Sequence, residues 1–213
     1  MAITSEDRIP QTLSAATIFL LKKTAYLPID DQDLVAEALF AAARWHHGEI
    51  RKNGNPYILH PIQAAGIVAM LHSDIAAIIA ALLHDTLENS EVTPQELERS
   101  FGKDAKKLVE ALTKYAAFSH REYAEKLYIR SQEDGRVAVL KVADCCANLM
   151  HHDQLHFSAT KHLEHLQEAR ELYLAWLVPL PGFPSELGKM LNRIIAASQE
   201  DYESRSDKTH AIR

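Results

Sequence analysis

The sequence predicts an all-α fold in which a single domain surrounds one hydrophobic core. Apolar residues recur at the three- and four-residue spacing of helices along nearly the whole chain. Glycine is rare, with 7 among 213 residues, and no alternating run of β-branched residues is long enough to predict a strand. A chain of this length buries one sizeable core, or at most two small ones. The sequence contains no repeat and no linker-like stretch, which favours one domain.

The first part of the chain is expected to form two helices followed by a loop. Residues 13–23, "LSAATIFLLKK", have an apolar part too short to cross a bilayer, and their lysines follow that part, whereas those of a signal peptide precede it. We therefore expect a helix that packs on the domain or faces a partner. A second helix, 31–48, starts at aspartates and ends at a glycine. The stretch 49–61, "EIRKNGNPYILHP", predicts a loop because it is rich in glycine, asparagine and proline.

Three helices are expected in the middle of the chain. The first covers 61–72, with Pro61 in the initial position that proline favours. The second, 73–85, is apolar nearly all round and is therefore expected to be the central buried helix. Thr93 and Glu96 form a capping box that opens a short helix, which we expect to stop near "FG".

The rest of the chain is expected to be helical apart from one break. "PLPGFPSE" interrupts the pattern, and a last helix runs to about Tyr202 before a polar tail. The other helices are expected over 103–117, 120–134, 135–152 and 161–178. We interpret the chain as three parts: a helical extension packed on the domain (1–30), the domain core (31–178), and a C-terminal helix with a polar tail (179–213).

Composition restricts the class of function. The formal net charge of −6 argues against a general nucleic-acid binder, which would carry a basic excess, but local cations still allow an anionic small substrate. Cys145 and Cys146 are the only cysteines and are neighbours, so a disulfide framework is excluded, which suits a reducing cytoplasm. We expect a cytoplasmic protein that binds neither nucleic acid nor membranes.

Histidine and aspartate side chains interrupt the apolar helices at positions that suggest a metal site. His84 and Asp85 end the most apolar helix, and burying a carboxylate costs several kcal/mol unless it is paired or bound to a metal. His60 lies near the start of the preceding helix, and Asp144 interrupts "VAVLKVADCCANL". Two imidazoles and two carboxylates suit Mn²⁺, Fe²⁺, Zn²⁺ or Mg²⁺. The residues alone leave two readings open, a metal site and a capped polar pair.

Four motifs, taken together and in this order, resemble the HD-domain hydrolase module of RelA/SpoT proteins. They are "ARWHHGEIRKNGNPYILHP", "AALLHDTLEN", "FGKDAKKLVEALTK" and "VLKVADCCANL". The resemblance covers roughly residues 33–152, and the overall length is similar to that of the stand-alone small alarmone hydrolases. It implies an all-α HD-domain helical bundle that removes pyrophosphate from the 3′ position of (p)ppGpp and leaves GDP or GTP.

The resemblance also implies roles for individual residues. One divalent metal ion, usually Mn²⁺, would be held by four ligands: His60, His84, Asp85 and Asp144. Arg51 and Lys52 match a loop that stacks on the base and neutralises phosphate. Asn148 would contact the nucleotide. Lys141 shares a helix face with Asp144 and Asn148, and would either meet a phosphate or neutralise the ligand cluster.

The chain departs from the family pattern at two places. After the His-Asp pair the family usually carries Glu-Asp, whereas this chain has Glu88 and Asn89. Glu88 lies four residues after His84 and would face the metal if the helix continues that far. Asn89 cannot take a proton at neutral pH, so either it only orients the water or its presence costs about 10²- to 10⁴-fold in rate. Cys145 and Cys146 replace the usual Arg-Leu, which removes a cation.

These departures leave three functions open, all of which involve a small nucleotide. The first is the metal-dependent 3′-pyrophosphohydrolase. The second keeps the site and changes the substrate, since relatives in this family also take the 2′-phosphate of NADPH or adenosine alarmones. The third is a catalytically weakened alarmone-binding or regulatory protein. The terminal helices also allow a homodimer.

Overall fold

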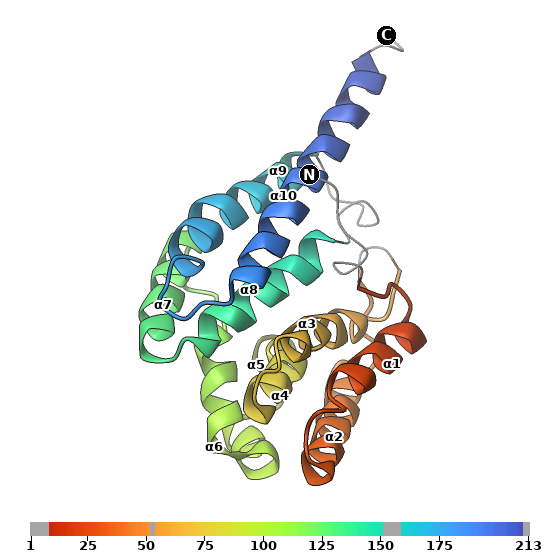
Figure 1. Ribbon diagram of the computed structural model, residues 1–213, viewed down its shortest axis with the longest axis vertical. Helices are drawn as coiled ribbons and strands as arrows, with labels where there is room; N and C mark the ends of the chain where they lie inside the picture. The colour runs from red at the N-terminus through yellow and green to blue at the C-terminus, as the bar shows by residue number, and fades with distance from the viewer. Residues whose placement is uncertain (1–8, 52–53, 151–158, 211–213) are drawn as a thin grey trace.

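The computed structural model describes residues 9–51, 54–150 and 159–210, and shows them as a bundle of helices (Figure 1). In chain order the elements are α1 (Leu13–Lys23), α2 (Ile29–Trp45), α3 (Leu59–Met70), α4 (Ile75–Leu83), α5 (Thr86–Asn89), α6 (Pro94–Leu112), α7 (His120–Glu133), α8 (Arg136–Leu149), α9 (Ala159–Glu168), the π-helical segment η2 (Ala169–Leu177) and α10 (Ser185–His210). The predicted all-α fold is confirmed.

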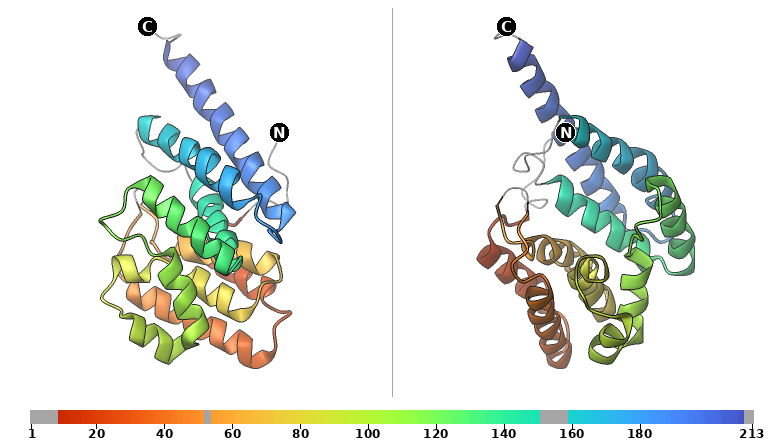
Figure 2. Two further views of the ribbon diagram at one scale, coloured as in Figure 1. Left: turned by 90° about the vertical axis from the view of Figure 1, so that its left-hand side faces the viewer. Right: turned by 180° about the vertical axis from the view of Figure 1, so that it is seen from behind.

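Helix α3 lies at the centre of the bundle, with α1, α4 and α8 packed against it. Helix α4 also packs on α2 and α6, whereas α8 packs on α7, η2 and α10. In Figures 1 and 2, α1 to α6 form the lower part of the molecule, α7, α9 and α10 form the upper part, and α8 runs between them. The junction of α3, α4 and α8 is therefore the place where the two parts meet.

The core follows from the apolar pattern of the two central helices. Every position of α4 from Ala76 to Leu83 is buried, which confirms that this helix is buried as expected, although α3 is the more central of the two. In α3, every position from Leu59 to Ala69 is buried, including His60. The alanines of both helices allow neighbouring helices to approach closely, and polar side chains in such a core need partners.

Helix starts are fixed by the side chains that the sequence places there. Thr93 and Glu96 form the predicted capping box at the start of α6, and Ser119 opens α7 in the same way. The Asp74 carboxylate accepts a hydrogen bond of 3.0 Å from the Ala77 backbone at the start of α4. Pro61 lies within the first turn of α3, where a missing N–H costs nothing.

Three elements differ from the expectation. Helix α4 ends at Leu83 and α5 begins at Thr86, so the His-Asp pair lies in a break between helices. Helix α6 is interrupted at Gly102, whose φ of 84° glycine tolerates, as the expected stop near "FG" requires, but the part after this kink ends at Leu112 instead of residue 117. The last helix reaches His210 instead of ending near Tyr202.

Helix α1 packs on the bundle through one face. Ala16 and Leu20 are buried, whereas Ile18 and Leu21 on the same helix are exposed.

The expected homodimer stays a prediction. Within the described residues, the helices are too short or too polar to cross a membrane.

Candidate metal centre

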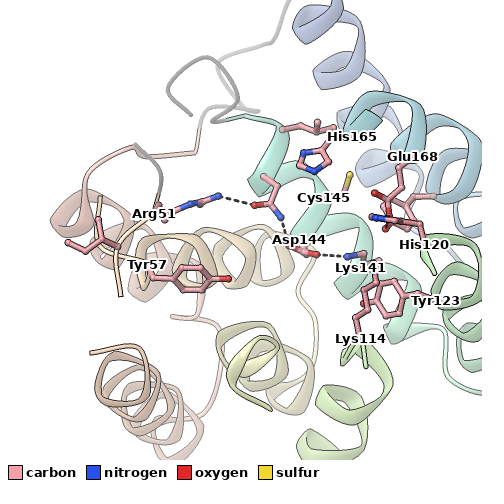
Figure 3. A pocket seen from close by; sticks show the side chains of 14 residues that line it. Arg51, Tyr57, Lys114, His120, Tyr123, Lys141, Asp144, Cys145, His165 and Glu168 are labelled. Carbon is pink, nitrogen blue, oxygen red and sulfur yellow. Dashed lines mark hydrogen bonds and ion pairs between the residues drawn. The ribbon is translucent and has the colours of Figure 1, made fainter. Parts of the chain in front are cut away.

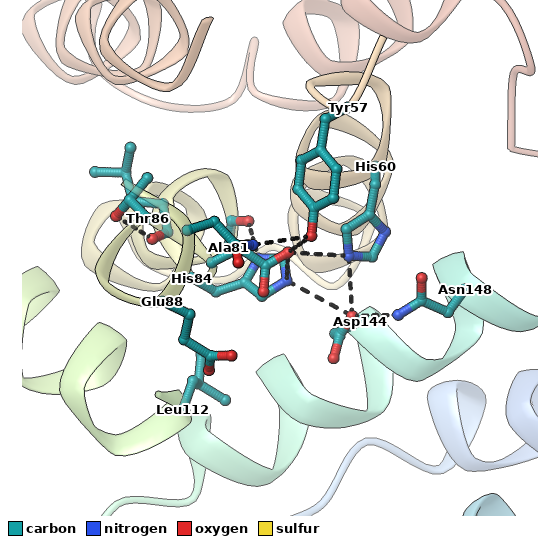
Figure 4. A network of polar contacts seen from close by, with 12 residues as sticks. Tyr57, His60, Ala81, His84, Thr86, Glu88, Leu112, Asp144 and Asn148 are labelled. Atoms are coloured by element: carbon teal, nitrogen blue, oxygen red, sulfur yellow. Dashed lines mark hydrogen bonds and ion pairs between the residues drawn. The ribbon is translucent and has the colours of Figure 1, made fainter. Parts of the chain in front are cut away.

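The four predicted metal ligands come together from separate parts of the chain: His60, His84 and Asp144 face one another in Figure 4, and Asp85 lies beside the two histidines. His60 lies in the first turn of α3, His84 and Asp85 in the break after α4, and Asp144 on α8. The Nε2 atom of His60 lies 3.0 Å from Oδ1 of Asp144 and 3.6 Å from Oδ2 of Asp85. The ligand atoms of His60, His84 and Asp144 all lie within 4.8 Å of one another. This spacing suits a shared metal ion.

His84 shows most directly that the cluster fits a cation. Its Nδ1 atom lies 2.9 Å from the carbonyl oxygen of Ala81, so Nδ1–H is the donor there and Nε2 is left to face the site. Nε2 is buried and makes no hydrogen bond among the described residues. It lies 3.2 Å from Oδ2 of Asp85 and 3.6 Å from Oδ1 of Asp144. A nitrogen lone pair beside two carboxylates is stable only with a cation, either a proton or a metal ion.

The protonation of the two histidines follows from their surroundings. Burial lowers the pKa of His60, which the carboxylate of Asp144 only partly offsets. Burial would also lower the pKa of His84, but the charge of Asp85 and the nearby Asp144 raise it well above the ordinary value. These carboxylates therefore favour the protonated form of His84 in the absence of metal. Binding of a metal ion would release that proton, as is usual for histidine ligands.

Asp144 is held by a row of polar side chains along α8. Lys141 Nζ donates to its Oδ2 atom at 2.8 Å, and Asn148 Nδ2 donates to its Oδ1 atom at 2.8 Å. Burial alone would raise the pKa of Asp144, but the ammonium of Lys141 and the neighbouring imidazoles of His60 and His84 hold it well below its ordinary value. The predicted common face of Lys141, Asp144 and Asn148 is present. In this structure Lys141 contacts the ligand cluster.

The loop before α3 joins this row through Arg51. The Nη2 atom of Arg51 donates to Oδ1 of Asn148 at 2.9 Å (Figure 3). The side-chain amide of Asn148 therefore links Arg51 to Asp144 by hydrogen bonds. Lys52, which was predicted to act beside Arg51, lies outside the described residues.

Glu88 and Asn89 lie on the short helix α5 and differ in what they face. Glu88 lines a cavity of about 200 Å³ together with His84, Asp85 and Asp144. Its Oε1 atom accepts a hydrogen bond from the backbone N–H of Lys114. Partial desolvation by its neighbours raises the pKa of Glu88 above its ordinary value, although this hydrogen bond opposes the shift. Both residues are exposed, and the Nδ2 atom of Asn89 lies 3.4 Å from the hydroxyl oxygen of Tyr57.

A larger cavity of about 430 Å³ adjoins the metal cluster and shares several of its lining residues (Figure 3). Three cationic side chains line it, Arg51, Lys114 and Lys141, together with tyrosine rings from three elements. Lys141 Nζ lies 5.2 Å from the ring centres of both Tyr123 and Tyr173. The far end is lined by His120, His165 and Glu168, and the wall includes Cys145. Cations and aromatic rings around one cavity suit an anionic ligand with a planar group.

Sequence reasoning missed several of these residues. Tyr57 precedes His60 by three positions, a spacing that places both on one side of a helical turn. Lys114, Tyr123 and Tyr173 come from a loop, from α7 and from η2, and no local pattern links them. At the end of α2, His46 is buried, whereas His47 is exposed.

Comparison with known proteins identifies the family. The family model described as "HD domain" matches residues 38–175. The chain belongs to the HD domain family. A GTP pyrophosphokinase of Myxococcus xanthus is 34% identical over 179 residues, which cover 79% of this chain and 22% of that protein. The bifunctional (p)ppGpp synthase/hydrolase SpoT of Escherichia coli is 35% identical over 131 residues, which cover 58% of this chain and 19% of that protein. This HD domain chain thus spans about a fifth of the length of these two relatives.

A solved structure confirms the fold of the HD domain. The description of that structure reads "A metazoan ortholog of SpoT hydrolyzes ppGpp and plays a role in starvation responses". The likeness has a TM-score of 0.68 at 23% identity and covers 80% of this chain and 97% of the other.

Proposed function

We propose that this HD-domain chain is a metal-dependent 3′-pyrophosphohydrolase that converts (p)ppGpp into GDP or GTP and pyrophosphate. The observation that carries the proposal is the cluster of His60, His84 and Asp144 beside a cavity with cationic and aromatic walls. The names of the relatives support the same reaction, since they include a guanosine-3′,5′-bis(diphosphate) 3′-pyrophosphohydrolase of Escherichia coli O157:H7, 35% identical over 131 residues.

His60, His84, Asp85 and Asp144 would hold the metal ion, for which Mn²⁺ is our proposal. A mixed set of imidazole and carboxylate ligands suits this ion. When bound, such an ion lowers the pKa of a coordinated water and neutralises charge on a phosphate oxygen. The unpartnered Nε2 atom of His84, which faces two carboxylates, supports the presence of a cation at this position.

The larger cavity would bind the nucleotide. Arg51 is held through Asn148 at one side of the cavity, where its planar guanidinium can stack on a purine. Lys114 and Lys141 line the cavity next to the metal cluster and would neutralise phosphate groups at the reacting end. Lys52 has the same expected role from the sequence alone.

Glu88 is the residue we propose as the general base. It lines the small cavity that also contains the metal cluster, and its raised pKa brings it closer to the value that proton transfer at neutral pH requires. The backbone N–H of Lys114 orients its carboxylate. Asn89 cannot take the proton, and Glu88 is sufficient for this role in our account.

The lining of the cavity also favours a second candidate with the same site. Cys145 lies in the wall, where the family pattern usually has an arginine, so one cation for a phosphate group is missing. This change is compatible with the 2′-phosphate of NADPH or with an adenosine alarmone.

A substrate panel separates the candidates. Metal-free protein is loaded with Mn²⁺ and given ppGpp, pppGpp, pppApp and NADPH at equal concentration, with a chelated sample as control. We expect the highest kcat/KM for ppGpp or pppGpp, with pyrophosphate as product, and no turnover after chelation. Preferential release of inorganic phosphate from NADPH would replace the first candidate by the second, whereas tight binding of ppGpp without turnover would indicate a regulatory protein.

A further inference from the structure

Asp85 has a partner outside the proposed ligand set. The hydroxyl of Tyr57 donates a hydrogen bond of 2.7 Å to its Oδ2 atom. The same oxygen lies 3.2 Å from Nε2 of His84 and 3.6 Å from Nε2 of His60. The phenol therefore contacts the carboxylate oxygen that faces the site. Asp85 sits in the break between α4 and α5, so no regular helix fixes its side chain.

The ring of Tyr57 is itself held by two histidines. The ring of His46 packs on it with a centre-to-centre distance of 4.9 Å and an interplanar angle of 33°. The ring of His60 meets it edge-on at 6.1 Å. His46 is buried at the end of α2, and its Nδ1 atom lies 3.1 Å from Oε2 of Glu49. Two helices thus orient the phenol before any ligand binds.

Asn89 is a second neighbour of the Tyr57 hydroxyl. Its amide Nδ2–H donates to the hydroxyl oxygen of Tyr57 at 3.4 Å. An amide donor at this place leaves Asp85 as the acceptor for the phenolic proton. A carboxylate at position 89 would be a second acceptor, and the hydroxyl of Tyr57 would then donate its hydrogen bond to either of two acidic residues.

We propose that Tyr57 is a positioning residue that holds the Asp85 carboxylate toward the metal site, and that Asn89, which adds no second carboxylate beside the phenol, leaves Asp85 as its acceptor. Partners of this kind fix the orientation of a metal-binding carboxylate, and their loss typically costs about 10- to 100-fold in metal affinity. Asn89 thereby gains a role other than proton transfer. The inference rests on the metal site of the proposed function, but not on the choice of nucleotide.

Mn²⁺ titration of the metal-free protein tests the role of Tyr57. We expect Tyr57→Phe, which keeps the ring, to bind Mn²⁺ about tenfold more weakly than the natural protein. In a background of Asp85→Asn the same substitution should change the affinity by less than about twofold, because the carboxylate it positions is gone. Tyr128→Phe is the matched control, since its ring packs on Trp176 and does not line either cavity. Its Mn²⁺ affinity should be unchanged.

The outcomes separate this inference from the proposed function. Equal Mn²⁺ affinity of Tyr57→Phe and the natural protein would overturn the inference while leaving the metal site intact. An equal loss with and without Asp85→Asn would overturn it as well, because Tyr57 would then not act through Asp85. A natural protein that binds no Mn²⁺ would overturn both. Thermal unfolding of each metal-free variant verifies that the compared proteins are folded.

A second pair of variants tests Asn89. We expect Asn89→Asp to weaken Mn²⁺ binding in the natural background, where Tyr57 can donate its hydroxyl proton to the new carboxylate. In the Tyr57→Phe background there is no such hydroxyl, and we expect Asn89→Asp to leave Mn²⁺ binding unchanged. Asn89→Ala, which adds no acceptor, should stay within about twofold of the natural affinity. An effect of Asn89→Asp that is the same in both backgrounds would show that position 89 acts on the metal by charge alone.

Discussion

The Lys141–Asp144 pair allows a quantitative prediction, because it joins a buried cation to a metal ligand. Nζ and Oδ2 lie 2.8 Å apart, and at an effective dielectric constant of about 20 two unit charges at this distance attract by about 6 kcal/mol before desolvation is counted. The pKa of Lys141 is raised well above its ordinary value by Asp144, despite the opposing effect of burial. Lys141→Met keeps an apolar stem between Tyr123 and Tyr173 and removes only the charge.

Two measurements follow from this substitution. Without metal, we expect the free energy of unfolding to fall by about 3 kcal/mol, the lower end of the cost of a broken buried pair, because His60 and His84 still compensate Asp144. With Mn²⁺ the loss should be smaller by about 1.4 kcal/mol, which by linkage means about tenfold tighter Mn²⁺ binding to the variant. Chemical denaturation with and without Mn²⁺ measures both quantities, and Lys141→Arg is the charge-retaining control. Weaker Mn²⁺ binding by Lys141→Met would refute the reasoning, since Lys141 would then hold Asp144 for the metal instead of competing with it.

Further predictions concern the general base and the packing of α1. Glu88→Gln should lower kcat by about 10²- to 10⁴-fold while Mn²⁺ affinity changes little, and retained full activity would exclude Glu88 as the base. Glu88 must be ionised to act as the base, and its pKa is raised. As the pH is lowered, kcat should therefore begin to fall at a higher pH than it would for a base with the pKa of an ordinary glutamate. Mn²⁺ binding measured over the same pH range separates this effect from protonation of the histidine ligands. Leu20→Ala removes a fully buried side chain of α1 and should lower the free energy of unfolding by about 2–5 kcal/mol. Leu21→Ala, exposed on the same helix, should change it by less than about 0.5 kcal/mol, and equal losses would show that α1 does not pack as described.

The ligand cluster could be predicted from the sequence, whereas the geometry around it could be predicted only in part. His60, His84 and Asp144 are polar residues at the ends or in the middle of apolar helices. Burying them costs free energy unless they pair with one another or bind a common ion. The row of Lys141, Asp144 and Asn148 follows from helical spacing alone, and the hydrogen bonds of α8 show it.

The break after α4 could not be predicted in the same way. The apolar pattern runs without interruption to Leu83, and periodicity gives no sign that the helix stops before Asp85 rather than after Glu88. Hydrogen bonds that form only in the tertiary structure occur here, such as that from Tyr57 to Asp85. The same applies to Lys114, whose backbone reaches Glu88 from another helix end. Contacts between segments distant in sequence have no local pattern, and a single sequence gives no information on them.

Hydrolysis of ppGpp by the metal-loaded and the metal-free protein is the most direct test of the account. We predict that the protein with Mn²⁺ releases GDP and pyrophosphate in equal amounts, and that chelation abolishes the release until Mn²⁺ is restored. His84→Ala should bind little Mn²⁺ and show no release. Absence of turnover at high enzyme concentration, with Mn²⁺ demonstrably bound to the natural protein, would contradict the central claim.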